Sequence, residues 1–352
     1  MADCDLTLTL ADRVRIATSQ GAALRLVGSD TKRFYGRPVD ADVLELRGHT
    51  GIVNYDPAEL VLTARCGTML AEIEALLASN GQRLAFDPPQ YGAAGTIGGA
   101  IAAGLAGPGR VRFGSARDYV LGVRMLAGDG RVLRFGGEVM KNVAGYDVSR
   151  LLAGSLGILG VLLEISIKVL PRAPTELTLA FDRDQSAALQ TLTQWSGTAL
   201  PVSAGAWVDG RLHVRFEGSE ATLASVANRL GGERVEPAPA FWTGLRDQTH
   251  AFFARTGRLW RLQLPLGVAP LPVGMTLVEW QGMQRWCYEE DGIDLHAVAA
   301  AAGGSASLFR GAVGSEEVFA PLAPPVLELH RSLKQVFDPA GILNPGRMYA
   351  GL

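Results

Sequence analysis

Hydrophobic and polar positions alternate most regularly in one segment near the middle of the chain. Its apolar positions share one face of a predicted strand: Val161, Leu163, Ile165, Ile167 and Val169. The residues between them run from Leu162 to Lys168, so we expect one buried face and one that becomes progressively more polar. Pro171 and Pro174 follow directly, which predicts a domain boundary at this point.

The chain before this boundary has a pattern of short strands, small helices and many turns. Short apolar runs predict strands at residues 24–27, 43–46, 60–64, 119–125 and 131–135. The last two runs flank Gly128-Asp129-Gly130, which favours a hairpin. A helical stripe runs through Leu70, Ile73, Leu76 and Leu77. We expect Thr68 to be the N-cap of that helix and Asn80-Gly81 to end it.

The pattern after the boundary alternates strands and helices in another order. Strands are predicted at residues 177–181, 203–208, 211–217 and 259–264, and helices at residues 185–195 and 219–230. The order β-α-β-β-α-β is the ferredoxin-like pattern, here with a long insertion before the last strand. A second hairpin is expected over residues 276–288 and a final helix over residues 327–337.

Length and composition narrow the class of protein. A chain of 352 residues predicts about two domains, and 48% hydrophobic with 19% charged residues predicts globular folding. A net charge of −2 argues against a nucleic-acid binder. Three widely spaced cysteines form neither a disulfide framework nor a metal motif. We expect no signal peptide and no membrane helix, so any membrane attachment would come through a partner.

Glycine is the unusual component, and it is concentrated in one region. The chain has 43 glycines, of which seventeen lie between Gly92 and Gly160. In the segment 95–104, consecutive amides and a helix beginning near Gly98 could converge on an anion. The loop Gly28-Ser29-Asp30-Thr31 offers a second group of amides, and two such loops suit a pyrophosphate.

Close packing of helices and strands is the alternative explanation for small residues. A third cluster, Gly154-Ser155-Leu156-Gly157 through Gly160, shifts the balance toward a binding site, because backbone at these glycines could approach a flat ring or a ribose. No GxGxxG with a following acid and no GxxxxGK[ST] is present. The glycines therefore suggest a dinucleotide site that is neither Rossmann nor P-loop.

Several motifs together resemble a known family, the FAD-binding domain of the vanillyl-alcohol-oxidase/para-cresol-methylhydroxylase (PCMH) type. They are Pro88-Pro89 with the segment 95–99, Phe113 to Asp118, Met140 to Asp147 and Gly154 to Gly157. The closing segment 337–346 is similar to that of the family's hydroxy-acid branch. Residues 48–57 and 139–150 look more closely like those of FAD-binding subunits of bacterial glycolate oxidases.

The resemblance implies an α+β fold with three parts. A two-lobed PCMH-type FAD-binding domain would span residues 1–172. A ferredoxin-like antiparallel-sheet cap domain, which carries the substrate site, would span residues 175–325. A C-terminal segment, residues 326–352, would return to the FAD domain.

The resemblance also implies the residues that contact FAD. Main-chain amides of two segments would hold the pyrophosphate: Gly28, Ser29, Asp30, Thr31 and Lys32, then Pro89, Gly95, Thr96, Ile97, Gly98, Gly99 and Ala100. Ser115 and Asp118 would lie near the flavin and adenosine parts, and Gly157, Ile158 and Val161 would contact the adenine end. Asn344 and Arg347 would bring the C-terminus back to the cofactor.

Covalent attachment of FAD in relatives uses a His in the first loop or a Cys near the second. The first loop here has neither, and Cys66 lies outside both in sequence. We therefore expect non-covalent FAD. Lys141 and Asn142 precede Tyr146 and Asp147 in a polar turn, and we expect a structural or cofactor-proximal role for them rather than a catalytic one.

Candidate catalytic residues are sparse in the second half. The five histidines are scattered, without the cluster that catalytic relatives tend to carry for a metal or a base, so no metal site is expected. Arg261 and Arg285 are the catalytic candidates, because a guanidinium can hold a substrate carboxylate by two parallel hydrogen bonds. Ordinary sheet packing with solvated charges is the alternative for each of them.

The resemblance implies a function in glycolate oxidation. The chain would join a larger FAD-binding subunit and an iron–sulfur subunit, and the complex would convert glycolate to glyoxylate and pass electrons to quinone. It would be cytoplasmic, with peripheral membrane association through those partners. Two alternatives stay open: a self-sufficient FAD-linked dehydrogenase of a small 2-hydroxy acid, and a non-catalytic flavin-binding assembly subunit.

Overall fold

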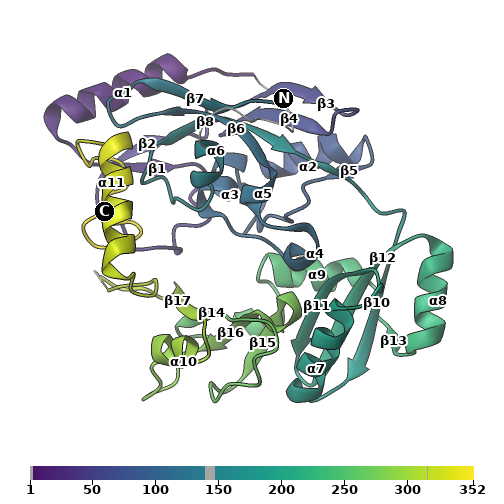
Figure 1. Ribbon diagram of the computed structural model, residues 1–352. Helices are drawn as coiled ribbons and strands as arrows, with labels where there is room; N and C mark the ends of the chain where they lie inside the picture. Colours follow the sequence, from purple (N-terminus) through teal and green to yellow (C-terminus); the bar gives the residue numbers. More distant parts are fainter. Residues whose placement is uncertain (1–2, 139–146, 315) are drawn as a thin grey trace. The chain divides into compact units, whose positions relative to one another are not determined.

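A computed structural model of the chain describes residues 3–138, 147–314 and 316–352. The chain forms two compact units (Figure 1). The first unit consists of Met1–Leu105, Ser115–Pro171 and Ala312–Leu352. The second unit consists of Ala106–Gly114 and Arg172–Gly311.

The first unit is built on a five-stranded antiparallel sheet with the order β3-β4-β8-β6-β7. Its strands are β3 (Ile52–Asp56), β4 (Val61–Arg65), β6 (Val120–Leu126), β7 (Val132–Gly136) and β8 (Val161–Lys168). Two small sheets complete the unit: the parallel pair β1 (Leu24–Val27) and β2 (Asp42–Glu45), and the antiparallel pair β5 (Gln82–Arg83) and β9 (Leu170–Pro171). The predicted strands and the hairpin before Pro171 are confirmed, with shifts of one or two residues at their ends.

Strand β8 has one apolar and one increasingly polar face as expected, and both faces are covered. Val161 and Leu163 pack with residues of α1 (Thr7–Gln20), a helix that the sequence patterns above do not indicate. On the other face Leu162 is buried, and the hydroxyl of Ser166 lies 2.9 Å from that of Thr63. Helix α3 (Ile97–Ala103) contacts this strand as well, so β8 is an internal strand.

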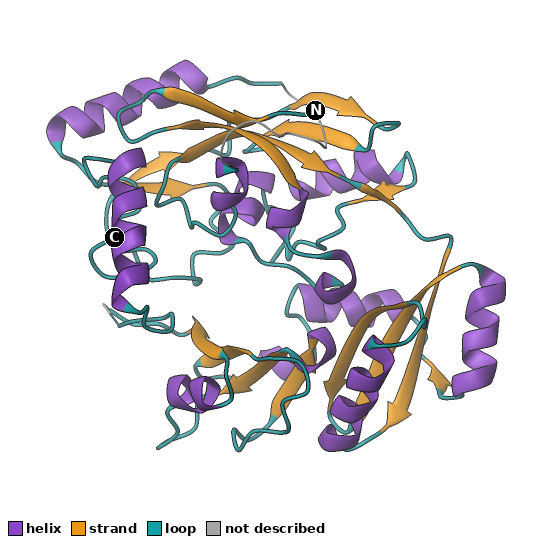
Figure 2. Cartoon of the chain, in the orientation of Figure 1, coloured by secondary structure: helices purple, strands orange, loops and turns teal. Residues whose placement is uncertain are grey.

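The remaining helices of the first unit are short, except at the C-terminus. They are α2 (Leu70–Ala78), α3 (Ile97–Ala103), α5 (Ala116–Tyr119), α6 (Val148–Leu151) and α11 (Pro324–Phe337). Figure 2 shows α3, α5 and α6 gathered along one side of the sheet. Thr68 is not the N-cap of α2: that position is Met69, and the Thr68 hydroxyl instead accepts a hydrogen bond from the Gly51 amide (3.0 Å).

The second unit is built on an eight-stranded antiparallel sheet with the order β13-β10-β12-β11-β15-β16-β14-β17. The first half comprises β10 (Thr175–Asp182), α7 (Gln185–Ser196), β11 (Val202–Val208), β12 (Arg211–Gly218), α8 (Glu220–Leu230) and β13 (Glu233–Arg234). In order of sequence its strands lie 4-1-3-2, which is the ferredoxin-like arrangement. Its fourth strand is β13 and not residues 259–264, so the expected insertion is wrong. Leu177, Leu192 and Leu223 belong to the core between this half-sheet and its helices.

The second half of this sheet repeats the same strand order. It comprises β14 (Leu259–Gln263), β15 (Thr276–Glu279), β16 (Gln284–Tyr288), α10 (Leu295–Ala301) and β17 (Ser305–Arg310). The halves join where β11 pairs with β15. Three short helices lie outside this repeat: α4 (Arg110–Phe113), α9 (Ala238–Arg246) and the 3-10 turn η1 (Ala251–Ala254).

Two segments belong to units other than the expected domains. Residues 106–114 pack in the second unit, where the Trp280 indole donates to the Gly107 carbonyl (3.0 Å) and the Arg110 guanidinium lies 4.7 Å from the Trp280 ring centre. Residues 312–325 pack in the first unit, where Arg37 forms an ion pair with Glu317 (2.8 Å). Both placements depend on contacts between residues that are distant in the sequence, which local sequence patterns do not predict.

Candidate cofactor site

A single pocket of the first unit gathers residues from all three glycine-rich segments. Its lining residues are Arg25 to Arg33, Tyr35, Leu46, Cys66, Thr96, Gly98, Gly99, Ala102, Ala103, Leu156, Gly157, Gly160, Leu162, Asn344 and Arg347. The space between them measures about 920 Å³, part of which is open to solvent.

The loop after β1 carries hydrogen-bond donors without protein partners. Among the described residues, the amides of Gly28, Ser29, Asp30 and Thr31 donate to no other protein group. The hydroxyl of Ser29 is buried and has no partner either. A buried polar group without a partner costs free energy, so the Ser29 hydroxyl, with the unpartnered amides beside it, fits a ligand with acceptor oxygens.

The geometry of this loop depends on Gly28. A Cβ at this position would lie 2.7 Å from the Thr96 hydroxyl oxygen, so glycine lets the loop close against the start of α3. Asp30 adopts a left-handed conformation (φ +57°), and its carboxylate accepts two hydrogen bonds from Arg25 at 3.0 and 3.1 Å. The loop is thereby held in one shape while its amides stay available.

The start of α3 differs, because its amides are already used. The Ile97 amide donates to the Thr68 carbonyl (3.0 Å), and the Gly98 amide donates to the Cys66 carbonyl (2.9 Å). The Gly99 amide donates to the hydroxyl of the N-cap, Thr96 (3.2 Å). The expectation that these amides hold a pyrophosphate therefore does not fit the hydrogen bonds of this segment.

Gly98 is required for packing. A Cβ at Gly98 would lie 2.6 Å from the Cys66 Cβ and 2.7 Å from its carbonyl oxygen, which is closer than real Cβ atoms approach. The glycine thus brings α3 against the end of β4 and does not serve mainly to admit a ligand. Cys66 itself lines the pocket, although in sequence it lies outside both loops. Burial raises the pKa of the Cys66 thiol well above its ordinary value, so the thiol is protonated.

The C-terminal residues Asn344 and Arg347 shape the pocket through the backbone of other segments. The Asn344 side chain accepts from the Leu26 amide (2.8 Å) and donates to the Leu156 carbonyl (2.7 Å). The Arg347 guanidinium donates to the Arg37 carbonyl at 2.9 Å and to the Arg33 carbonyl at 3.1 Å. Burial lowers the pKa of Arg347 to about 10.

The charged residues that line the pocket are mostly cations. Asp30 is the one carboxylate among the lining residues, against the cations of Arg25, Lys32, Arg33 and Arg347. This excess of positive charge attracts an anion such as a diphosphate. Unpartnered amides, an orphaned hydroxyl and net positive charge together fit the pyrophosphate of a dinucleotide.

Eleven of the predicted cofactor residues line this pocket: Gly28, Ser29, Asp30, Thr31, Lys32, Thr96, Gly98, Gly99, Gly157, Asn344 and Arg347. Eight do not: Pro89, Gly95, Ile97, Ala100, Ser115, Asp118, Ile158 and Val161. Some of the eight have other uses. The Gly95 carbonyl accepts from Leu70 (2.7 Å), and Ser115 with Asp118 forms the capping box of α5. Pro89, Ile97, Ala100 and Val161 are buried.

The sequence analysis missed several residues of the pocket. Arg25, Tyr35, Leu46 and Cys66 line it but belong to no motif, because they come from separate segments that only the fold brings together. Ala102 and Ala103 could have been found, since they continue the small-residue run of α3.

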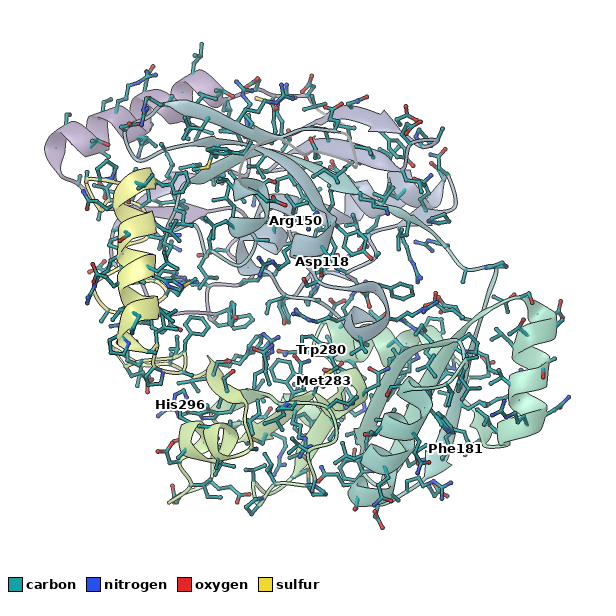
Figure 3. The ribbon with its side chains drawn as sticks, in the orientation of Figure 1. Asp118, Arg150, Phe181, Trp280, Met283 and His296 are labelled. Carbon is teal, nitrogen blue, oxygen red and sulfur yellow. The ribbon has the colours of Figure 1, made fainter. Side chains whose placement is uncertain are left out.

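The motif residues Met140 to Tyr146 lie outside the described residues, as do Lys141 and Asn142 within that range. Asp147 is described, and its carboxylate caps α6 by accepting from the Arg150 amide (3.2 Å). Figure 3 shows Arg150 on α6 and Asp118 on α5, two short helices of the same unit.

The two candidate arginines of the second unit differ in their hydrogen bonds. Arg285 is 1% exposed, and its guanidinium donates to the carbonyls of Gly282 (3.3 Å), Ala269 (2.7 Å) and Val268. Each of its three nitrogens already donates to a backbone carbonyl, so Arg285 braces the loop before β15 and the expected catalytic role is not supported.

Arg261 keeps part of its guanidinium available. Its Nε donates to Gln284 (2.7 Å), and its cation lies 5.1 Å from the ring centre of Trp280, which is labelled in Figure 3. Among the described residues its two terminal nitrogens form no hydrogen bond. This planar fork could hold a carboxylate.

Histidines and metals add nothing to the site in the described part of the chain. No group of three or more potential metal ligands occurs there. His213 stacks on Phe241 with ring centres 4.1 Å apart, and burial lowers its pKa to about 4. Among the described helices, none is both long enough and apolar enough to cross a bilayer.

Comparisons with known proteins identify the family to which the chain belongs. The FAD binding domain family matches residues 5–136, and the family of FAD linked oxidases, C-terminal domain, matches residues 288–348. Glycolate oxidase subunit GlcE of Escherichia coli is 47% identical over 355 aligned positions, covering 100% of both chains. D-lactate dehydrogenase of Archaeoglobus fulgidus is 28% identical over 74% of this chain and 71% of its own.

A solved structure of alkyldihydroxyacetonephosphate synthase has the same fold, with a TM-score of 0.65. It is 15% identical and covers 96% of this chain and 74% of its own. The chain is therefore a PCMH-type FAD-binding oxidoreductase with an α+β fold. Within that class it belongs to the family of glycolate oxidase subunit GlcE, and its cofactor is FAD.

Proposed function

We propose that the chain is the FAD-binding subunit of a glycolate oxidase complex, which oxidises glycolate to glyoxylate. The observation that carries this proposal is the 47% identity to GlcE over the full length of both chains. The complex would contain a larger FAD-binding subunit and an iron–sulfur subunit, and electrons would pass from them to quinone. A GlcD subunit from Bacillus subtilis is 32% identical over 53% of this chain, which supports two related flavin subunits in one complex.

FAD would be held without a covalent bond. The first loop contains no histidine or cysteine, and the Cys66 thiol is 3% exposed with a raised pKa. A protonated, buried thiol is a poor nucleophile. Retention would instead come from the amides of Gly28 to Thr31, the Ser29 hydroxyl and the surrounding cations. These contacts are reversible, so FAD should dissociate on dilution and rebind.

The residues of the chain would bind and orient, while the cofactor supplies the redox chemistry. FAD when bound accepts a hydride from carbon and passes electrons onward. The Arg261 fork would hold the carboxylate of a 2-hydroxy acid, because Trp280 shields the guanidinium and Gln284 fixes its orientation. No base for the hydroxyl proton is identified among the described residues.

The runner-up is a self-sufficient dehydrogenase of a small 2-hydroxy acid, and the available Arg261 fork favours it. The two functions separate in an anaerobic titration of the isolated, FAD-loaded chain with glycolate, followed at the visible flavin bands. An electron-carrying subunit keeps oxidised bands alone and loses them only when the partner subunits are added. A self-sufficient dehydrogenase bleaches alone. Failure to take up FAD at all would contradict both functions.

A further inference from the structure

The end of α11 holds a buried ion pair that the proposed function does not use. Lys334 is 7% exposed and Asp338 is 1% exposed, and the ammonium lies 2.6 Å from one carboxylate oxygen. Burial lowers the pKa of Lys334, which Asp338 partly opposes. Two charges taken out of water in this way need further partners to be tolerated.

Every donor of the ammonium has an acceptor. Besides Asp338, the Lys334 Nζ donates to the Ile158 carbonyl (2.8 Å) and to the Leu343 carbonyl (2.7 Å). The Asp338 carboxylate accepts in turn from the amides of Leu343 (2.8 Å) and Ile342 (3.2 Å). The pair therefore ties the end of α11 to two backbone segments of the first unit.

Both segments continue directly into the cofactor pocket. Ile158 follows Gly157, and Leu343 precedes Asn344, and these two neighbours line the pocket. Asn344 lies in a left-handed conformation (φ +43°) and contacts Leu26 and Leu156 through its side chain. A Cβ at Gly157 would lie 2.8 Å from the side-chain nitrogen (Nδ2) of Asn344, so this part of the pocket has little freedom to shift.

Fold stability alone does not explain a buried ion pair, because apolar residues of similar volume stabilise a core as well or better. An apolar pair cannot donate hydrogen bonds to two carbonyls. We propose that Lys334 and Asp338 are positioning residues for the cofactor, which fix the backbone at Ile158 and Leu343 and so the pocket at Gly157 and Asn344. This inference rests on the FAD site of the proposed function.

The test compares three double variants with the wild-type chain for FAD dissociation constant, by flavin fluorescence, and for the melting temperature of the apoprotein. Lys334→Met with Asp338→Asn removes both charges and both carbonyl contacts, and we expect FAD binding to weaken about tenfold. Lys334→Gln with Asp338→Asn keeps amide donors, so binding should recover part of that loss. The control is Glu328→Gln with Arg331→Met, an exposed pair on the same helix with 3.5 Å between its charged atoms, which should change neither quantity.

A folded Met/Asn variant with wild-type affinity for FAD would overturn the proposal, and so would a Gln/Asn variant that binds no better than Met/Asn at equal melting temperature. If Met/Asn does not fold, Gln/Asn decides: weakened binding supports the positioning role and unchanged binding overturns it. A wild-type chain that binds no FAD would instead contradict the cofactor site, and the inference with it.

Discussion

Two glycine-rich segments line the same pocket, yet they differ in what their backbone can offer a ligand. In the described part of the chain, the amides of Gly28 to Thr31 donate to no protein group, and the buried Ser29 hydroxyl has no partner. At the start of α3, the amides of Ile97, Gly98 and Gly99 all donate to protein groups. Glycine content alone does not identify an anion site. The hydrogen bonds of each amide distinguish a segment that can bind a ligand from one whose glycines serve packing.

Hydrogen bonds also distinguish the two candidate arginines of the second unit. Arg285 donates to three backbone carbonyls, whereas Arg261 uses Nε and leaves its fork unpaired among the described residues. Both side chains are almost fully buried, so burial gives no distinction between them. We expect donors with hydrogen-bond partners in the protein to support the fold, and donors without such partners to support binding.

The largest effect is expected from Gly98→Val. The new side chain would clash with Cys66, so α3 and the end of β4 must separate, at a cost of roughly 3 kcal/mol or more. The melting temperature of the apoprotein should fall steeply, and FAD retention should fall with it. Gly99→Ala is the matched control, because its Cβ meets only the Thr96 hydroxyl at 3.2 Å. A Gly98→Val chain with native apoprotein stability but no FAD would show that Gly98 serves the ligand after all.

Arg285→Met should destabilise the chain by roughly 2–4 kcal/mol, because buried carbonyls of the second unit lose their donor. Arg261→Met should change stability much less and should remove any effect of glycolate on the chain. Urea unfolding and glycolate-induced changes in tryptophan fluorescence measure the two properties. Equal loss of stability in both variants would contradict the distinction between the two arginines.

Gly28→Ala should weaken FAD binding about tenfold, or about 1.4 kcal/mol, since the added Cβ pushes the loop away from Thr96. Apoprotein stability should change little, because the loop moves while the Thr96 hydroxyl keeps its hydrogen bond from the Gly99 amide. Calorimetric titration with FAD and thermal unfolding are compared on the same preparation. A drop in melting temperature without a change in affinity would place Gly28 with Gly98 as a packing glycine.

The last prediction concerns His213, a residue of the second unit whose titration tests the packing of that unit. Its pKa is about 4 in the fold against an ordinary 6.5, so the unfolded chain binds the extra proton between these values. Stability is therefore full above pH 6.5 and is lost as the pH falls toward 4, by at most ~1.4 kcal/mol per pH unit. His213→Phe should flatten this part of the pH profile of the melting temperature, and an unchanged slope would assign the loss to other groups.

The sequence predicted those elements whose signal is local. The strand at Leu24, the hairpin at Gly128 and the helix start near Gly98 follow from short runs of residues and from turn chemistry. Helix α1 was missed because its buried stripe includes Ala11 and Ala17, which carry a weak hydrophobic signal. The short β13 was missed because Glu233 and Arg234 are exposed and have no apolar pattern.

The candidate site was predictable in outline and not in detail. Glycine clusters and family motifs led to one pocket that gathers eleven of the predicted residues, because a backbone site needs residues without side chains. Which amides are available depends on distant carbonyls, such as those of Cys66 and Thr68, that no local pattern reveals. The role of Arg285 was missed for a similar reason, since its partners Val268 and Ala269 lie in a loop 17 and 16 residues earlier that no local pattern links to it.

The most direct test measures FAD affinity and apoprotein melting temperature for Ser29→Ala and Thr96→Ala. Ser29 has an orphaned hydroxyl, whereas the Thr96 hydroxyl caps α3. Ser29→Ala should leave or raise the melting temperature and weaken FAD binding about three- to tenfold. Thr96→Ala should cost about 1 kcal/mol of stability with a smaller change in affinity. The reverse result, with stability lost at Ser29 and affinity lost mainly at Thr96, would contradict the assignment of the cofactor anion to the loop 28–32.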